Sequence, residues 1–160
     1  MAVTITPERP DAQDAVALID ELEEHLASLY AKESRHGYSV EKLIAQGVAF
    51  FVLRDGGTPA GCGGVQLVGT EYGELKRMYV RPAFRGRGFA KLLLEHLVEQ
   101  VRNRGIPLVR LETGIHQTAA IGLYEAAGFR RIPPFADYWD DPVSRCYEKR
   151  LDVDAGGATG

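Results

Sequence analysis

Two long segments of the chain carry apolar residues at the spacing of an amphipathic helix. The first spans residues 11–29, and its apolar positions are Ile19, Leu22, Leu26 and Leu29. The second spans residues 89–104, and its apolar positions are Phe89, Leu93, Leu94, Leu97, Val98 and Val101. Residues three and four apart share one face, so each segment predicts a helix with one buried side. Asp11 or Asp14 is expected to cap the first helix, and Gly105 to end the second.

Shorter segments alternate with these two helices. Residues 39–46 begin with Ser-Val-Glu-Lys, and residues 117–127 stop before Gly128, so both are expected to be short helices. Apolar and β-branched runs bounded by Gly, Pro or Asp predict strands at residues 3–5, 48–53, 59–68, 74–80, 108–112, 129–132 and 144–151.

The order of these elements is typical of a mixed α/β fold, with one central sheet and helices on both faces. A chain of 160 residues suits one domain, which we place at residues 3–152. Residues 153–160 are rich in Gly and Ala and are expected to be a disordered tail.

Composition and charge narrow the functional classes. A net charge of −3 and a pI near 5.8 argue against a nucleic-acid partner, which normally meets a basic surface. No apolar run is long enough to span a membrane and the N-terminus shows no signal pattern, so we expect a cytoplasmic protein without a membrane partner. Cys62 and Cys146 provide no disulfide framework, and the four scattered histidines do not resemble a zinc site, so no metal is expected.

Glycines stand where the helix at residues 89–104 begins. Gly86 and Gly88 follow a predicted strand and a short loop, with Arg85 and Arg87 beside them. Such a start lets a ligand approach the unpaired N–H groups of the first turn, where the helix dipole favours an anion. The pattern therefore indicates either a diphosphate site or a plain turn with an N-cap. The Gly-Lys-Ser/Thr of a nucleoside-triphosphate loop and the third glycine of a dinucleotide fingerprint are both missing.

Two motifs in the right order resemble those of the GNAT N-acetyltransferase family. Arg85-x-x-Gly88-x-Ala90 matches the family signature (Gln/Arg)-x-x-Gly-x-(Gly/Ala) at the start of a Leu-rich helix. Residues 117–129 are similar to the family pattern Asn-x-x-Ala-x-x-x-Tyr-x-x-x-Gly-Phe. One departure is Gln117, which stands where Asn is usual.

The resemblance covers residues 3–152 and implies a fold and a reaction. The fold is a central, mostly antiparallel sheet in which the strands at 74–80 and 108–112 splay apart. The reaction is the direct transfer of an acetyl group from acetyl-CoA to a primary amine, without a metal.

The same resemblance implies how acetyl-CoA binds. Its pantetheine would pair like an extra strand with main-chain groups of Met78, Tyr79 and Val80. Its pyrophosphate would lie on the backbone N–H groups of Arg85, Gly86, Arg87, Gly88, Phe89, Ala90 and Lys91. The amide of Gln117, longer than the usual Asn, would still donate to a carbonyl of the ligand.

Tyr124 is the expected catalytic acid. The departing CoA sulfur is a thiolate, and a phenol of pKa about 10 is protonated at neutral pH and can supply a proton to it. The alternative is a core aromatic residue at the end of a helix, close in sequence to Phe129.

Glu74 is the expected base that removes the proton of the attacking amine. It lies six residues before Val80, where some members of the resembled family place a general base. Its alternative is a solvated strand-end carboxylate paired with Lys76. Glu112 and Glu33 are competing bases, through a water if necessary.

The sequence leaves the acceptor open. A small-molecule amine is the first expectation; a protein amine, or a catalytically silent module that only binds acyl-CoA, are the alternatives. Residues 22–47 and 133–143 are expected to determine the acceptor, with Arg35 or His36 available to bind a carboxylate. The aromatic and acidic loop at 138–142 is expected either to close over the acceptor or to form a homodimer contact.

Overall fold

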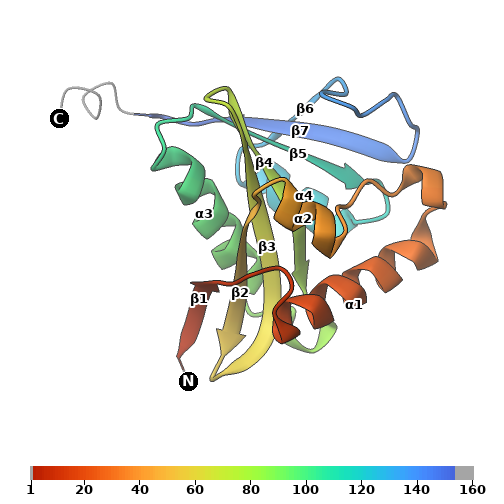
Figure 1. Cartoon of the computed structure of the whole chain (residues 1–160). Helices are drawn as coiled ribbons and strands as arrows, with labels where there is room; N and C mark the ends of the chain where they lie inside the picture. Colours follow the sequence, from red (N-terminus) through yellow and green to blue (C-terminus); the bar gives the residue numbers. More distant parts are fainter. Residues whose placement is uncertain (1, 154–160) are drawn as a thin grey trace.

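The computed structural model describes residues 2–153 as a seven-stranded sheet with helices on both faces (Figure 1). The strands are β1 (Val3–Pro7), β2 (Ala49–Asp55), β3 (Thr58–Val68), β4 (Tyr72–Val80), β5 (Leu108–Gly114), β6 (Arg130–Ile132) and β7 (Ser144–Arg150). The helices are α1 (Gln13–Leu29), α2 (Val40–Ala45), α3 (Phe89–Arg102) and α4 (Thr118–Ala126), with 3-10 turns η1 (Lys32–Ser34) and η2 (Pro82–Phe84). The mixed α/β class predicted from the sequence is confirmed.

The strands are arranged in the order β1-β2-β3-β4-β5-β7-β6. Neighbours are antiparallel except β4 and β5, which run parallel because α3 crosses over between them. The prediction of a mostly antiparallel sheet is therefore confirmed, and its one parallel junction lies at the centre.

Strands β4 and β5 pair only where they begin. Gly73 lies opposite Val109 and Glu74 lies opposite Arg110, and no later pair joins the two strands along their described lengths. The predicted splay of the central strands is confirmed, and it starts immediately after Glu74.

A β-bulge distorts β4 just beyond this point. On the β3 side the pairing shifts between Cys62 and Gly64, so that Arg77 and Met78 together lie opposite Gly63. The backbone of Arg77 is left-handed, with φ of 54°. A bulge leaves a residue outside the ladder and increases the local twist, which helps to turn the end of β4 away from β5.

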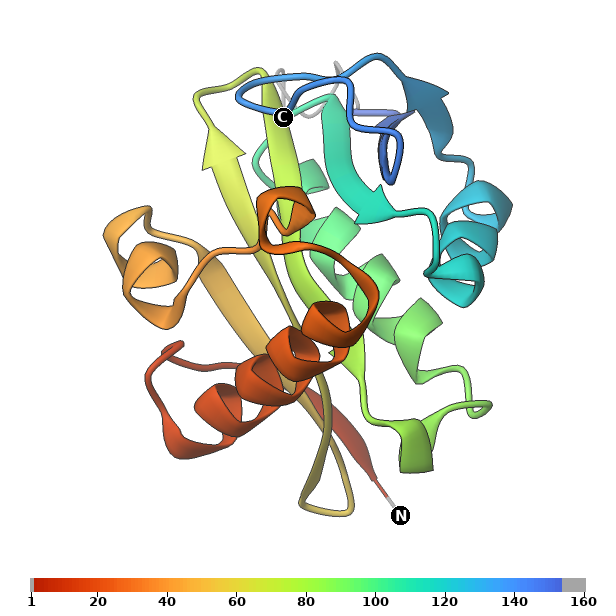
Figure 2. The ribbon, with the colours of Figure 1, turned by 90° about the vertical axis from the view of Figure 1, so that its right-hand side faces the viewer.

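The alternation of side chains along β2 divides the core between the two faces of the sheet. Phe50 and Val52 pack in the cluster with α1 and α2, whereas Phe51 packs in the cluster with α3 and α4. Figure 2 shows α1 crossing one face while α3 lies on the other. Packing from both faces fixes β4 and β5 in their divergent positions.

The expected cap of α1 is wrong. The helix begins after Ala12, which makes no side-chain cap, and neither Asp11 nor Asp14 serves as one. Both carboxylates are engaged elsewhere, because Asp11 pairs with Arg9 at 2.9 Å and Asp14 pairs with Arg54 at 2.8 Å.

Beyond β7 the structure describes only a few residues. Of the tail expected at 153–160, all except Val153 lie outside the described residues. Within residues 2–153 the structure contains no helix with both the length and the apolar character needed to cross a membrane.

Replacing Leu97 by Ala tests how α3 stabilises the sheet. Leu97 is fully buried in the cluster with Phe51 and Val65, so Leu97→Ala should lower the free energy of unfolding by about 2–5 kcal/mol. Leu92, on the same helix and 43% exposed, is the matched control, and Leu92→Ala should change it by less than about 0.5 kcal/mol. Urea denaturation followed by circular dichroism measures both, and equal losses would contradict this account of the core.

Candidate active site

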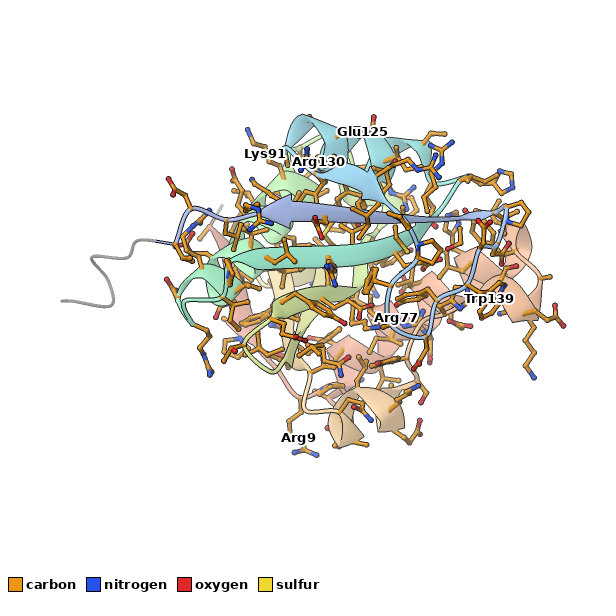
Figure 3. The ribbon with its side chains drawn as sticks, turned by 90° about the horizontal axis from the view of Figure 1, so that it is seen from above. Arg9, Arg77, Lys91, Glu125, Arg130 and Trp139 are labelled. Atoms are coloured by element: carbon orange, nitrogen blue, oxygen red, sulfur yellow. The ribbon has the colours of Figure 1, made fainter. Side chains whose placement is uncertain are left out.

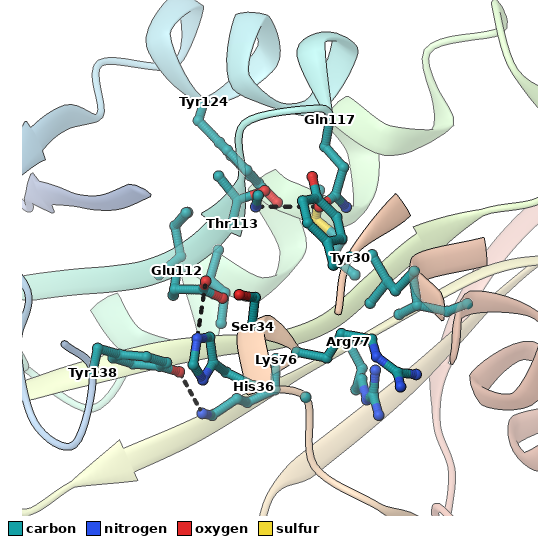
Figure 4. A pocket seen from close by; sticks show the side chains of 18 residues that line it. Tyr30, Ser34, His36, Lys76, Arg77, Glu112, Thr113, Gln117, Tyr124 and Tyr138 are labelled. Atoms are coloured by element: carbon teal, nitrogen blue, oxygen red, sulfur yellow. Dashed lines mark hydrogen bonds and ion pairs between the residues drawn. The ribbon is translucent and has the colours of Figure 1, made fainter. Parts of the chain in front are cut away.

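The divergence of β4 and β5 opens a cavity of about 90 Å³ between them. Its walls come from the C-terminal part of α1 and the segment up to Gly37, from β4, β5 and α4, and from Tyr138. Figure 4 shows Tyr124 and Gln117 reaching it from the α4 side, opposite His36 and Tyr138. A water needs roughly 10–15 Å³ on this measure, so the cavity admits several non-hydrogen atoms of a ligand.

Tyr124 lines the cavity from α4 and is itself buried. Its ring packs against Phe129 and Tyr147, with centroids 5.8 and 6.5 Å away. Burial, and to a lesser degree the charge of Glu112, raises the pKa of the Tyr124 phenol well above its ordinary value. The side chain is thus both a core aromatic residue and a protonated hydroxyl at the cavity.

Gln117 lies at the start of α4 with its side chain oriented by the protein. Its Oε1 accepts hydrogen bonds from the Gly114 N–H at 3.2 Å and from the Tyr30 hydroxyl at 3.4 Å. The Tyr30 oxygen in turn accepts from the His116 N–H at 2.9 Å. With the oxygen end of the amide held in this way, the NH₂ end is the donor that a ligand can use.

Glu112 is the carboxylate that reaches the cavity from β5. The Ser144 hydroxyl donates to its Oε2 at 2.6 Å, and Nε2 of His36 lies 4.0 Å from the same oxygen. Burial raises the pKa of Glu112 to about 7, although the Ser144 hydrogen bond and the charge of Lys76 act in the opposite direction. Glu112 is therefore close to half ionised at neutral pH.

Glu74 is not among the residues that line the cavity. It is only 4% exposed, and its Oε2 accepts from the Tyr138 hydroxyl at 2.5 Å and pairs with Lys76 Nζ at 2.8 Å. Lys76 also lies 3.9 Å from the ring centre of Tyr38. The pairing with Lys76 considered from the sequence is found, but the pair is buried rather than solvated. Glu33, the third candidate base, is exposed on η1.

The glycine-rich loop before α3 has the geometry of an anion site. Gly86 and Gly88 have φ of 82° and 81°, and Gly88 is the N-cap residue of α3. A Cβ built at either glycine would meet no atom within 4 Å, so the space over the loop is open. The neighbouring arginines are partly engaged, since Arg85 Nε donates to the Val80 carbonyl at 3.0 Å and Arg87 pairs with an aspartate of β2 at 2.8 Å.

Other residues predicted to bind acetyl-CoA lie in different surroundings. The side chains of Tyr79, Val80 and Phe89 are buried in the core, so only their main-chain groups are available. Met78 lines the central cavity, whereas Lys91 borders a second cavity of about 560 Å³ between α3 and α4. Figure 3 shows Lys91 on the α3–α4 side of the sheet, away from Arg77.

Two residues of the cavity, Tyr138 and Arg77, make contacts that the sequence does not predict. The Tyr138 hydroxyl contacts Glu74 and Lys76, which lie more than sixty positions earlier in the chain. Arg77 lies in the β-bulge of β4 and lines the cavity. The only signal in the sequence was the aromatic, acidic character of the loop itself. No cluster of three or more His, Cys, Asp or Glu side chains suited to a metal occurs within residues 2–153.

Sequence comparison matches residues 16–129 to the acetyltransferase (GNAT) family. The chain is 40% identical over 151 residues to an IAA acetyltransferase of Azospirillum brasilense, with 93% of this chain and 98% of that protein covered. It is 34% identical over 141 residues to the uncharacterised N-acetyltransferase YsnE of Bacillus subtilis (strain 168), covering 87% and 93% of the two chains. A solved structure from Klebsiella pneumoniae, assigned as an acyl-CoA N-acyltransferase, is similar with a TM-score of 0.80 at 35% identity, covering 94% and 98%.

Proposed function

The chain belongs to the GNAT acetyltransferase family, and we propose that it transfers the acetyl group of acetyl-CoA directly to the primary amine of a small molecule. The observation that carries the proposal is the cavity at the splay, because Glu112 and Tyr124 both line it. An ionisable carboxylate and a protonated phenol are the base and the acid that aminolysis of a thioester requires. The relative named IAA acetyltransferase supports a small-molecule acceptor.

Acetyl-CoA fits the open features of this chain. Its pyrophosphate is assigned to the N–H groups of residues 85–91, where two left-handed glycines leave the backbone uncovered. Its pantetheine is assigned to main-chain groups of residues 78–80, beyond the last pair between β4 and β5. The NH₂ group of Gln117 then donates to a carbonyl of the ligand. The bulge at Arg77–Met78 supplies a backbone N–H for the thioester carbonyl oxygen, which becomes negative when the amine attacks.

We assign the role of general base to Glu112 rather than Glu74. Glu112 lines the cavity and has a pKa of about 7, so it can take a proton from the acceptor ammonium at neutral pH. The Glu74 carboxylate lies behind Lys76 and Tyr138, whose contacts occupy its Oε2. In this proposal Glu74 keeps Lys76 paired inside the protein.

Tyr124 completes the transfer as the general acid. The amine nitrogen forms a bond to the thioester carbonyl carbon, and the carbon–sulfur bond of CoA breaks. The acceptor ammonium first gives one proton to Glu112, which passes it on to solvent, and the sulfur takes the proton of the Tyr124 hydroxyl. The second proton lost by the nitrogen after attack restores that hydroxyl. The products are an acetamide and free CoA.

Gly88→Val should abolish acetyl-CoA binding. A β-branched residue disfavours the left-handed backbone at this position, and its side chain would enter the space over the loop. Gly105→Val is the matched control, because Gly105 at the other end of α3 has φ of 70° and equally open surroundings. Calorimetric titration with acetyl-CoA should show binding by the control alone, and unchanged affinity of Gly88→Val would refute the placement of the pyrophosphate.

Purified protein with acetyl-CoA should release CoA only when a suitable primary amine is added. A panel of amines, with free thiol measured by a colour reagent and the product by mass spectrometry, tests the proposed function. With the best amine, Tyr124→Phe should bind acetyl-CoA normally but turn over about 10²–10⁴-fold more slowly. Tyr147→Phe, which removes a neighbouring buried hydroxyl that does not line the cavity, should remain active. A silent acyl-CoA-binding module would release no CoA with any amine.

The pH dependence of kcat/KM should identify the base. Only ionised Glu112 accepts a proton, so the wild-type rate should rise with pH through about 7, and Glu112→Gln should be slow and lack this rise. Glu74→Gln should keep the rise but move it to lower pH, because the charge of Glu74 contributes to the raised pKa of Glu112. Loss of the rise in Glu74→Gln, with the rise retained in Glu112→Gln, would return the role of base to Glu74.

A further inference from the structure

A guanidinium with an unused donor is buried in the wall of the cavity. Arg77 is 5% exposed; its Nη2 pairs with Glu23 at 2.7 Å and its Nε donates to the Tyr38 carbonyl at 2.9 Å. Its Nη1 is buried and has no hydrogen-bond partner within residues 2–153. An unpaired buried donor of a charged group is costly, so a site that retains one is suited to a ligand that accepts from it.

A second arginine with the same property lies next to it. Arg35 is 21% exposed, its Nη1 pairs with the other oxygen of Glu23 at 3.1 Å, and its Nε is buried without a partner in the described chain. Two guanidinium groups therefore share one carboxylate, which leaves one positive charge unbalanced. Arg35 and Arg77 both line the cavity, and Figure 4 shows Arg77 in its wall.

The absence of a side chain at Gly37 leaves room for the guanidinium of Arg77. A Cβ at Gly37, which also lines the cavity, would lie 2.2 Å from Arg77 Nη1, so this residue must lack a side chain for Arg77 to occupy its position. The guanidinium therefore packs closely against the backbone of Gly37.

We propose that the acceptor is a small amine that also carries a carboxylate, as a free amino acid does, and that Arg77 and Arg35 bind this carboxylate. The inference rests on the proposed acetyl transfer and names its substrate class. A carboxylate accepts from both unused donors and balances the extra positive charge. The other cation of the wall, Lys76, is already paired with Glu74 and does not compete.

Glu112 and the two arginines then recognise the two charged groups of the substrate. The ammonium group is placed at Glu112, which is the ionisable carboxylate of the wall, and the carboxylate is placed at the arginines. The N-terminus of a protein has a neutral amide where a free amino acid has a carboxylate, so it leaves the extra positive charge of the arginines unbalanced. The geometry therefore favours free amino acids over protein amines.

Paired substrates test the inference. CoA release should be measured for the standard amino acids and for their carboxamides, which differ only in the charged group. For the best amino acid, the carboxamide should show kcat/KM lower by at least tenfold, mainly through a higher KM. Arg77→Lys, which keeps the charge but loses the planar fork, should bring the acid-to-amide ratio towards one.

A variant with the same kind of ion pair provides the control. Arg81, the residue directly after β4, also pairs with a glutamate of α1, with Nη2 2.7 Å from Glu21, but it does not line the cavity. Arg81→Lys should therefore leave the ratio unchanged. Gly37→Ala keeps every charge and displaces the Arg77 guanidinium, so it should lower the ratio even if Arg77→Lys does not fold.

The outcomes separate this inference from the proposed function. If no amine supports CoA release, the acetyl transfer itself is refuted. If amines are acetylated but acids and carboxamides react equally, or only peptide amines react, the carboxylate site is overturned while the transfer stands. A ratio that is unaffected by both Arg77→Lys and Gly37→Ala overturns the assignment to Arg77.

Discussion

The loss of pairing between β4 and β5 is the constraint on which the rest of the structure depends. Backbone groups that leave a sheet need other partners, and a splay in the middle of a sheet is therefore tolerated only where the core on each side holds the strands apart. Here α1 and α3 pack on opposite faces of the same strands, and the bulge at Arg77 increases the divergence that starts after Glu74. The cavity, the unpaired edge of β4 and the position of Arg77 all follow from this one break.

Burial determines which carboxylate is free to act. Glu74 and Lys76 are both nearly inaccessible and are paired with one another, and breaking such a pair would leave an uncompensated charge inside the protein. Glu112 has only a hydroxyl and a distant imidazole beside it, so burial raises its pKa. Two carboxylates on adjacent central strands thus have different chemistry because only one of them has a close cation.

The geometry of the segments to which we assign acetyl-CoA could be predicted from the sequence, because its signals are local. The left-handed glycines at 86 and 88 and the spacing from Gln117 to Tyr124 lie within single strand–helix junctions. Most element boundaries were predictable for the same reason, whereas the splay of the sheet was implied by the family resemblance. The cap of α1 was not, since Asp11 and Asp14 are drawn to arginines outside the helix. The contacts that bury Glu74 were only partly predictable, because Tyr138 is 64 positions away and its loop shows no pattern that fixes its position.

The proposed acceptor site explains how a base with a raised pKa can still be ionised when it is needed. Burial raises the pKa of Glu112 to about 7, but an ammonium group placed beside it favours the carboxylate and lowers that pKa again. By linkage, the ionised form of Glu112 binds the ammonium more tightly, so ionisation of Glu112 and binding of the ammonium favour each other. Once the proton has moved, both groups are neutral, and the desolvation that raised the pKa now favours this neutral pair. The burial that makes Glu112 a weaker acid than an exposed glutamate therefore makes it a better proton acceptor at the cavity.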